Sequence, residues 1–185
     1  MENRSKQVAI LVTEGFEEVE LTEPKKALEE QGFVTHIITP EGKAVKAWAK
    51  TDWGQTYEAD QSLSEADPDD YDALLLPGGV MNPDKLRLEE EAVAFVEAFF
   101  EDNKPVAAIC HAPALLIEAD VVEGRQLTSY PSLQTDLLNA GADWVDEEVV
   151  TDGNLVTSRK PDDIPAFNRE MIRLISEGVS ADQQA

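Results

Sequence analysis

Cysteine is almost absent from this sequence, because Cys110 is the only one among 185 residues. A single thiol cannot form a disulfide within the chain, which is typical of a protein that works in a reducing compartment. Long apolar runs are also missing, so we expect no helix that spans a membrane. The chain begins with polar residues and passes directly into a strand pattern, without the apolar segment of a signal peptide. These features predict a cytoplasmic protein that does not bind membranes.

Metal ligands and phosphate-binding motifs are equally scarce. The two histidines, His36 and His111, and the single cysteine do not form a cluster with the spacing of metal ligands. The sequence also lacks the glycine pattern of a dinucleotide site and that of a P-loop. We therefore predict no metal and no cofactor. His36 lies in a strand-like segment and is predicted to be structural or on the surface.

Basic residues are few compared with acidic ones. Lys and Arg together number 15, Asp and Glu together 38, and the net charge is −23. This balance argues against binding to nucleic acid. The acidic residues are spread over every predicted surface segment, so we hypothesise adaptation to a cytoplasm of very high salt, where charges are screened over about 3 Å at 1 M. An ordinary acidic cytosolic protein is the alternative.

Short apolar segments alternate with amphipathic ones along the chain. This order predicts a three-layer α/β/α sandwich around a mostly parallel, flavodoxin-like sheet. We expect one domain over residues 1–185, with its core at about 7–176 and a frayed tail at 178–185. The predicted strands are 7–13, 33–39, 72–76, 106–109, 127–129, 144–145, 149–150 and 155–157, with a hairpin or short strands in 42–57. The predicted helices are 17–32, 83–103, one beginning at 111, 131–139 and 162–176.

Cys110 lies where the apolar strand 106–109 gives way to a helical pattern. Ala108 and Ala112 stand two positions either side of it, which is the arrangement of a nucleophile elbow. At the start of a helix, unpaired N–H groups lower the pKa of a thiol toward that of a thiolate. His111 follows directly and is a candidate base. The alternative is that Cys110 is a small, inert core residue.

Two further strand ends carry distinctive residues. In an open parallel sheet, chemistry collects at the carboxyl ends of the strands. Glu14 to Glu17 follow the first strand, and Gly78 and Gly79 follow the strand 72–76. Bare glycine N–H groups beside a nucleophile are suited to an oxyanion. A tight turn that requires glycine is the alternative explanation for the pair.

Taken together, several segments resemble the ThiJ/PfpI superfamily, which has the class I glutamine amidotransferase-like architecture, and within it the PfpI family of intracellular peptidases and deglycases. The matching segments, in order along nearly the whole chain, are 15–20, 72–79, 108–113, 124–125, 128–130, 139–142, 157–159 and 161–163. The resemblance implies a cysteine-dependent hydrolase, and it implies a homo-oligomer, either a dimer or a hexamer.

The resemblance also implies a role for each matching residue. Cys110 would be the nucleophile, His111 the general base, and Glu17 the carboxyl group hydrogen-bonded to the thiol. Gly78 and Gly79, with the His111 N–H, would form the oxyanion and substrate pocket, and Tyr130 would lie near its mouth. Asp84 would orient His111 from a neighbouring subunit, although it is one methylene shorter than the glutamate of some relatives.

For two of these residues a plainer role stays open. Glu17 is also what a solvated helix start would carry, and Asp84 suits a helix N-cap. If Glu17 and Cys110 are both buried, Glu17 should keep its proton, because two adjacent like charges are costly.

We weigh two functions. In the first, Cys110 attacks an acyl or aldehyde-derived carbonyl of a peptide, a protein or a small aldehyde such as methylglyoxal. In the second, the protein is a non-catalytic stress protein, a redox sensor or holdase whose thiol is oxidised. The first predicts turnover that is lost in Cys110→Ala, and the second predicts selective oxidation of Cys110 to the sulfinate by mild peroxide, with no turnover of any substrate.

Overall fold

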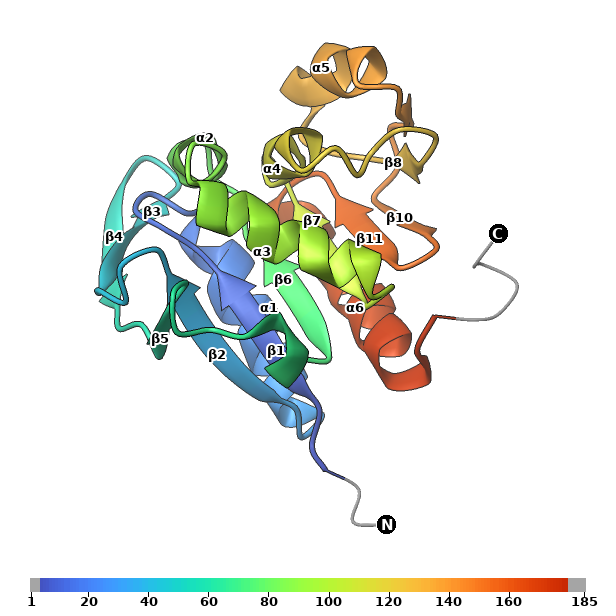
Figure 1. The fold of residues 1–185 in the computed structure, drawn as a ribbon. Coiled ribbons are helices and arrows are strands. Elements are labelled where there is room, and N and C mark those ends of the chain that lie inside the picture. Colours follow the sequence, from blue (N-terminus) through green and yellow to red (C-terminus); the bar gives the residue numbers. More distant parts are fainter. Residues whose placement is uncertain (1–3, 180–185) are drawn as a thin grey trace.

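The computed structural model describes residues 4–179 of the chain. Its elements form a seven-stranded sheet in the order β10-β11-β7-β6-β1-β2-β5, with helices on both faces (Figure 1). All neighbouring strands are parallel except β10 and β11. The predicted three-layer sandwich is therefore confirmed. The predicted tail falls mostly on residues 180–185, which lie outside the described residues.

The sheet strands are short, as expected for buried parallel strands. Three of its central strands, β1, β6 and β7, contain almost only apolar residues, because both of their faces are covered. The strands are β1 (Gln7–Leu11), β2 (Val34–Thr39), β5 (Gln61–Ser62), β6 (Ala73–Leu76), β7 (Val106–Ile109), β10 (Val149–Asp152) and β11 (Leu155–Ser158).

Two small ribbons and six helices complete the fold. The ribbons pair β3 (Val45–Ala49) with β4 (Asp52–Tyr57), antiparallel, and β8 (Gln126–Leu127) with β9 (Asp143–Trp144), parallel. The helices are α1 (Glu18–Glu30), α2 (Met81–Leu86), α3 (Glu90–Glu101), α4 (Pro113–Glu118), α5 (Gln134–Asn139) and α6 (Ile164–Glu177). The hairpin predicted in 42–57 is confirmed.

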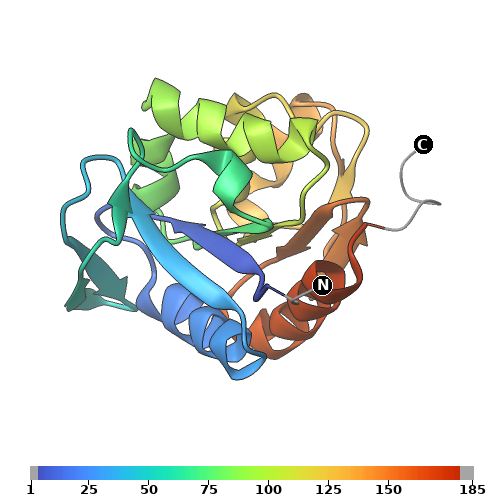
Figure 2. The ribbon, with the colours of Figure 1, turned by 60° about the horizontal axis from the view of Figure 1, so that its bottom comes forward.

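Alternate residues of each strand supply two separate cores. In β1, Val8 and Ile10 pack in the core beneath α1 and α6, which lie side by side (Figure 2), whereas Ala9 and Leu11 face the core beneath α3. Phe167 of α6 fills one core and Phe99 of α3 the other, both with no exposed surface. Burying a side chain of this size contributes about 2–3 kcal/mol. Both cores hold the sheet rigid beneath its carboxyl edge.

The segment 83–103, predicted as one helix, is two helices in the structure. α2 ends at Leu86, and Glu89 is extended where α3 begins. Leu86 and Ala92 are both buried in the same core. In one continuous helix, residues six apart would point about 120° away from each other. The break therefore lets both side chains reach the core.

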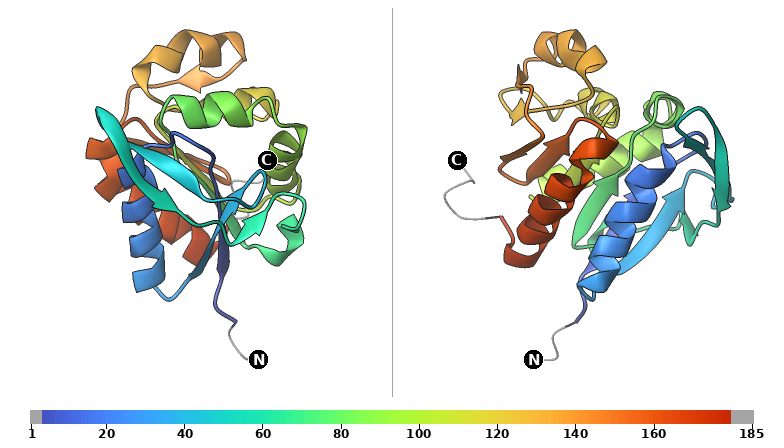
Figure 3. Two further views of the ribbon diagram at one scale, coloured as in Figure 1. Left: turned by 90° about the vertical axis from the view of Figure 1, so that its left-hand side faces the viewer. Right: turned by 180° about the vertical axis from the view of Figure 1, so that it is seen from behind.

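The β3–β4 hairpin stands apart from the main sheet and covers the start of α1, as the views from the side and from behind show (Figure 3). Its backbone is tied to the loop after β1, because Gly15 N donates to Lys46 O at 2.9 Å and Trp48 N donates to Phe16 O at 2.7 Å. The hairpin thereby forms one wall above the carboxyl ends of β1 and β6.

Candidate active site

Cys110 follows β7 directly and adopts a left-handed backbone conformation, with φ of +65°. A non-glycine residue in this region is strained and needs support from its surroundings. Here its N–H donates to Ser158 O at 3.0 Å, and its carbonyl accepts from Tyr130 N at 2.8 Å. The predicted nucleophile elbow is confirmed. The helix that follows begins three residues later, at Pro113, and has only six residues.

Two backbone N–H groups point at the Cys110 sulfur, those of Gly79 and His111. Gly79 follows β6, and His111 is the next residue of the elbow. Both donors favour a negative charge at this position and lower the pKa of the thiol. The structure therefore brings the backbone donors implied for an oxyanion pocket to the sulfur from two different strand ends.

The carboxyl group beside the thiol belongs to Glu20, and the assignment of Glu17 to that position is wrong. Glu20 lies in the first turn of α1, has no exposed surface, and its Oε2 accepts from Gly78 N at 2.9 Å. Its side chain interacts with that of Cys110. In a chain with so many acidic residues, the sequence does not distinguish one buried glutamate on a helix from the exposed glutamates. Only its place one helical turn after Glu17 could have suggested it.

Burial raises the pKa of Glu20 to about 8. Burial, followed by the nearby Glu20 carboxyl group, also raises the pKa of the Cys110 thiol, so the expected shift toward a thiolate is wrong for the resting pair. Two adjacent groups with raised pKa values do not both ionise at neutral pH. Glu20 therefore keeps its proton when the sulfur becomes negative, and a protonated carboxyl can donate to a thiolate.

Glu17 lines the cavity without contacting the thiol. It is the N-cap residue of α1, and its Oε1 accepts from Lys50 N at 3.1 Å, which fastens the turn of the β3–β4 hairpin to the helix start. Burial raises the pKa of Glu17 from its ordinary value. The residue is therefore part of the wall, not a bare solvated helix start.

His111 is held on three sides. Its Nδ1 lies 3.1 Å from Cys110 Sγ, and its Nε2 lies 3.2 Å from Ser132 Oγ. Its ring stacks on Tyr130, with centroids 4.5 Å apart and planes at 21°. Burial lowers the pKa of His111, so the imidazole is neutral at pH 7 and can accept a proton. Neither Ser132 nor the stacking could be found from the spacing of residues along the chain.

Asp84 lies away from this group. It is exposed within α2 and is not among the residues that line the cavity. The alternative role as an N-cap is also wrong, because α2 begins at Met81 and Val80 caps it. A role for Asp84 across a subunit interface stays a prediction.

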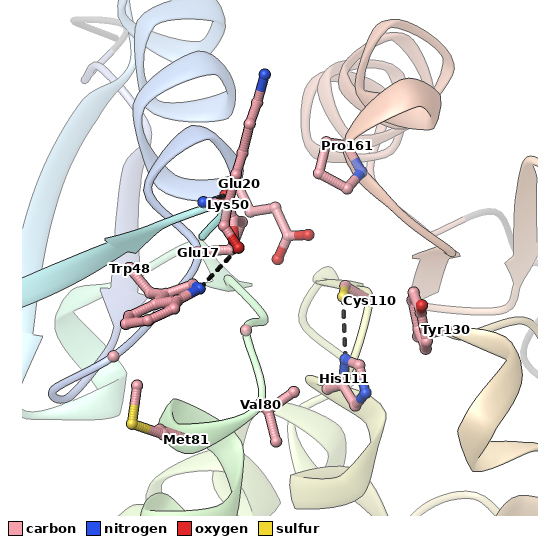
Figure 4. Close-up of a pocket in the computed structure, with 12 residues that line it drawn as sticks. Glu17, Glu20, Trp48, Lys50, Val80, Met81, Cys110, His111, Tyr130 and Pro161 are labelled. Carbon is pink, nitrogen blue, oxygen red and sulfur yellow. Dashed lines mark hydrogen bonds between the residues drawn. The ribbon is translucent and has the colours of Figure 1, made fainter. Parts of the chain in front are cut away.

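These groups open into one cavity of about 490 Å³. Cys110, His111 and Tyr130 form one side of it, and Trp48, Val80, Met81 and Pro161 supply apolar surface around them (Figure 4). Lys50 also lines it, but its ammonium points away from the thiol (Figure 4). Within residues 4–179, no group of three or more His, Cys, Asp or Glu side chains is arranged to hold a metal ion.

Comparison with known proteins shows which family the chain belongs to. The DJ-1/PfpI family profile matches residues 6–174. The chain belongs to the DJ-1/PfpI family. Two similar proteins are "Putative cysteine protease YraA" of Bacillus subtilis, 46% identical over 92% of this chain and 99% of that one, and "Protein/nucleic acid deglycase 2" of Escherichia coli, 46% identical over 92% of this chain and 98% of that one.

A solved structure agrees with this assignment. The crystal structure of Drosophila melanogaster DJ-1beta matches with a TM-score of 0.82 and 29% identity, covering 95% of this chain and 97% of that one. The match agrees with the mostly parallel sheet of this chain. In the part of the chain that the structure describes, no helix is long and apolar enough to cross a membrane.

Proposed function

We propose that this protein is a cysteine-dependent hydrolase of the PfpI type, with Cys110 as its nucleophile. One observation carries the proposal: the Cys110 sulfur lies 3.1 Å from a neutral histidine nitrogen and faces two backbone N–H donors inside a cavity. The names of the Bacillus subtilis and Escherichia coli relatives, a cysteine protease and a deglycase, support the same reaction class.

The first step is attack of the sulfur on a carbonyl carbon. The thiol proton moves to His111 Nδ1, a bond forms between Sγ and carbon, and the carbonyl electrons move onto oxygen. The N–H groups of Gly79 and His111 then stabilise the oxyanion. Because the proton leaves as the bond forms, the raised pKa of the resting thiol does not prevent the attack.

The second stage releases the product. When the carbonyl group carries an amine, the His111 imidazolium returns its proton to that amine, and the bond between carbon and nitrogen breaks. Water then attacks the thioester and gives one proton to His111. The bond between carbon and sulfur breaks, the acid is released, and His111 returns the proton to the sulfur. This sequence applies to peptides, and methylglyoxal adducts on proteins belong to the same proposed range of substrates. A free aldehyde forms a hemithioacetal in the first step.

The cavity supports a small or extended substrate with an apolar part. Trp48 and Tyr130 face it from the hairpin and from the loop after β8, and Tyr130 is 41% exposed. An aromatic face beside the thiol favours a flat acyl or aldehyde group over a bulky aliphatic one. Stress protection against reactive aldehydes is the physiological role that we propose for this site.

A redox-sensing or holdase function would use the same thiol. Only 6% of Cys110 is exposed, and burial raises its pKa, both of which slow the reaction of a thiol with peroxide. A base at 3.1 Å and two oxyanion donors are needed for hydrolysis and not for oxidation. These features favour the enzyme.

Replacement of the nucleophile tests the proposal. Cys110→Ala should reduce turnover of methylglyoxal and of fluorogenic peptide reporters to background, with an unchanged thermal midpoint to show that the fold persists. His111→Gln should lower kcat by at least about 100-fold, the usual contribution of a general base. Retained turnover in Cys110→Ala would refute the proposal. Selective oxidation of Cys110 by mild peroxide, with no turnover of any substrate by the unaltered protein, would favour the sensor.

A further inference from the structure

Ser132 is the side chain that meets the outer nitrogen of His111. Its Oγ lies 3.2 Å from Nε2, while Nδ1 of the same ring faces the Cys110 sulfur at 3.1 Å. The three polar groups therefore form a line from thiol to imidazole to hydroxyl. Stacking on Tyr130 fixes the plane of the His111 ring. What remains open is which of the two ring nitrogens carries the proton.

The loop that carries Ser132 is anchored on the elbow itself. Tyr130 N donates to Cys110 O at 2.8 Å, and a 3-10 turn begins at Pro131, in which Leu133 N donates to Tyr130 O at 3.0 Å. The Ser129 hydroxyl, which donates to Tyr130 O at 2.9 Å, accepts from Trp144 Nε1 at 2.9 Å. This network places the stacking ring and the Ser132 hydroxyl on the same short, braced segment.

We propose that Ser132 is a positioning residue that fixes the tautomer of His111. Its hydroxyl oxygen accepts the Nε2–H proton, so that the lone pair of the neutral ring lies on Nδ1, toward the thiol. This inference rests on the proposed hydrolase function for its role in turnover, but the tautomer itself is a property of the resting protein.

The chemistry requires this orientation of protons. When the thiol proton moves from Sγ to Nδ1, the ring becomes an imidazolium with N–H groups on both nitrogens. Ser132 Oγ accepts from Nε2–H before and after the transfer, so no rearrangement of the ring accompanies it. If Nδ1 carried the proton instead, the ring could not accept the thiol proton at all without first losing its own.

Within one chain, the outer nitrogen of His111 therefore faces a hydroxyl and not a carboxylate, while a role for Asp84 from a neighbouring subunit stays a prediction. Asp84, the acid implied by the resemblance, is exposed on α2, and no hydrogen bond joins it to His111 in the described structure. A serine orients the ring without adding a negative charge. This suits a site in which the carboxyl group of Glu20 keeps its proton, because a negative charge nearby would oppose ionisation of the sulfur.

The tautomer can be measured directly by NMR on protein labelled with ¹⁵N-histidine. The chain has two histidines, so the His111 signals are assigned by comparison with a His36→Gln variant. Above its pKa, His111 of the unaltered protein should show the Nε2–H tautomer. Ser132→Ala should shift it toward a mixture, and Ser132→Thr, which keeps the hydroxyl, should restore it.

Kinetics provide the second measurement. Ser132→Ala should lower kcat about tenfold with KM unchanged, since one hydrogen bond that aligns a base is lost. Thr135→Ala is the matched control, because it removes an exposed hydroxyl one turn away on α5. It should leave both the tautomer and kcat unchanged.

Three results would overturn the proposal: an Nδ1–H tautomer in the unaltered protein, an unchanged tautomer in Ser132→Ala, or a tautomer that changes in Asp84→Asn but not in Ser132→Ala. The last would assign the orienting role to the acid. If the unaltered protein turned over no substrate, the proposed function would fail while the NMR result still decided the role of Ser132.

Discussion

At the scale of single residues, the site depends on one carboxyl group that keeps its proton. Glu20 is fully buried and accepts one backbone N–H, while its Oε1 has no hydrogen-bond partner. A buried unpaired acceptor is costly, whereas a protonated carboxyl oxygen is a donor, and the adjacent Cys110 sulfur is an acceptor when it becomes negative. A protonated Glu20 therefore explains both the unpaired Oε1 and the raised pKa.

Glu20→Gln should change how stability depends on pH. The folded pKa of about 8 lies above the ordinary value of 4.5, so the unfolded chain releases this proton first as pH rises. The contribution of Glu20 to the free energy of unfolding is complete below about pH 4.5, decreases between about pH 4.5 and pH 8, and is lost above about pH 8. The total decrease is about 5 kcal/mol. A neutral glutamine does not titrate, so the variant should gain stability relative to the unaltered protein between these limits.

Urea titrations at about pH 5 and about pH 8 measure this difference. A Glu123→Gln variant, altered at an exposed position, is the control and should show no such gain. An equal difference between Glu20→Gln and the unaltered protein at both pH values would show that Glu20 is ionised in the folded state.

At the scale of elements, the loop after β6 has to approach the loop after β1 very closely. Gly79 has φ of +79°, and a Cβ placed there would lie 2.6 Å from Glu17 N and 2.7 Å from Gly15 O. Both neighbours are backbone atoms that cannot move aside without displacing the start of α1. The same approach brings the Gly79 N–H to the sulfur.

Gly79→Ala should therefore destabilise the protein by about 3 kcal/mol or more, through backbone strain together with overpacking. Gly32→Ala separates the two causes, because Gly32 has φ of +82° and nothing lies within 4 Å of its added Cβ. Gly32→Ala should lower the free energy of unfolding by only about 1–2 kcal/mol. Equal losses, measured by urea titration, would mean that the close approach has no energetic consequence.

At the scale of the whole molecule, the net charge of −23 opposes compaction. The ion pairs are mostly exposed and contribute little individually, although Arg159 joins Asp163 and Asp146 in a small network. Repulsion is therefore balanced mainly by the two apolar cores on either side of the sheet. Adaptation to a high-salt cytoplasm remains our proposal for this surface.

Thermal midpoints should rise when KCl is increased from about 0.1 M to about 1 M, because the screening length falls from about 10 Å to about 3 Å. NaCl at equal ionic strength should give the same increase if screening is the cause. A higher midpoint at low salt would contradict the proposal.

The order of strands and helices could be predicted because the signal for each is local. A buried parallel strand is an apolar run in any context, and Val106 to Ile109 followed by the Cys110 turn shows this plainly. The turn that carries Cys110 could therefore be predicted from its neighbours in sequence. The break between α2 and α3 was missed, because it depends on where Leu86 and Ala92 meet the same core.

The sequence by itself determined the layered fold and the elbow that carries Cys110, since each depends on residues a few positions apart. Only the tertiary structure decided which glutamate lies beside the thiol, and which side chain meets the outer nitrogen of His111. Glu20 and Ser132 reach Cys110 and its histidine through packing of α1 and of the loop after β8. Such proximity is set by three-dimensional distance, which spacing along a chain rich in acidic residues does not reveal.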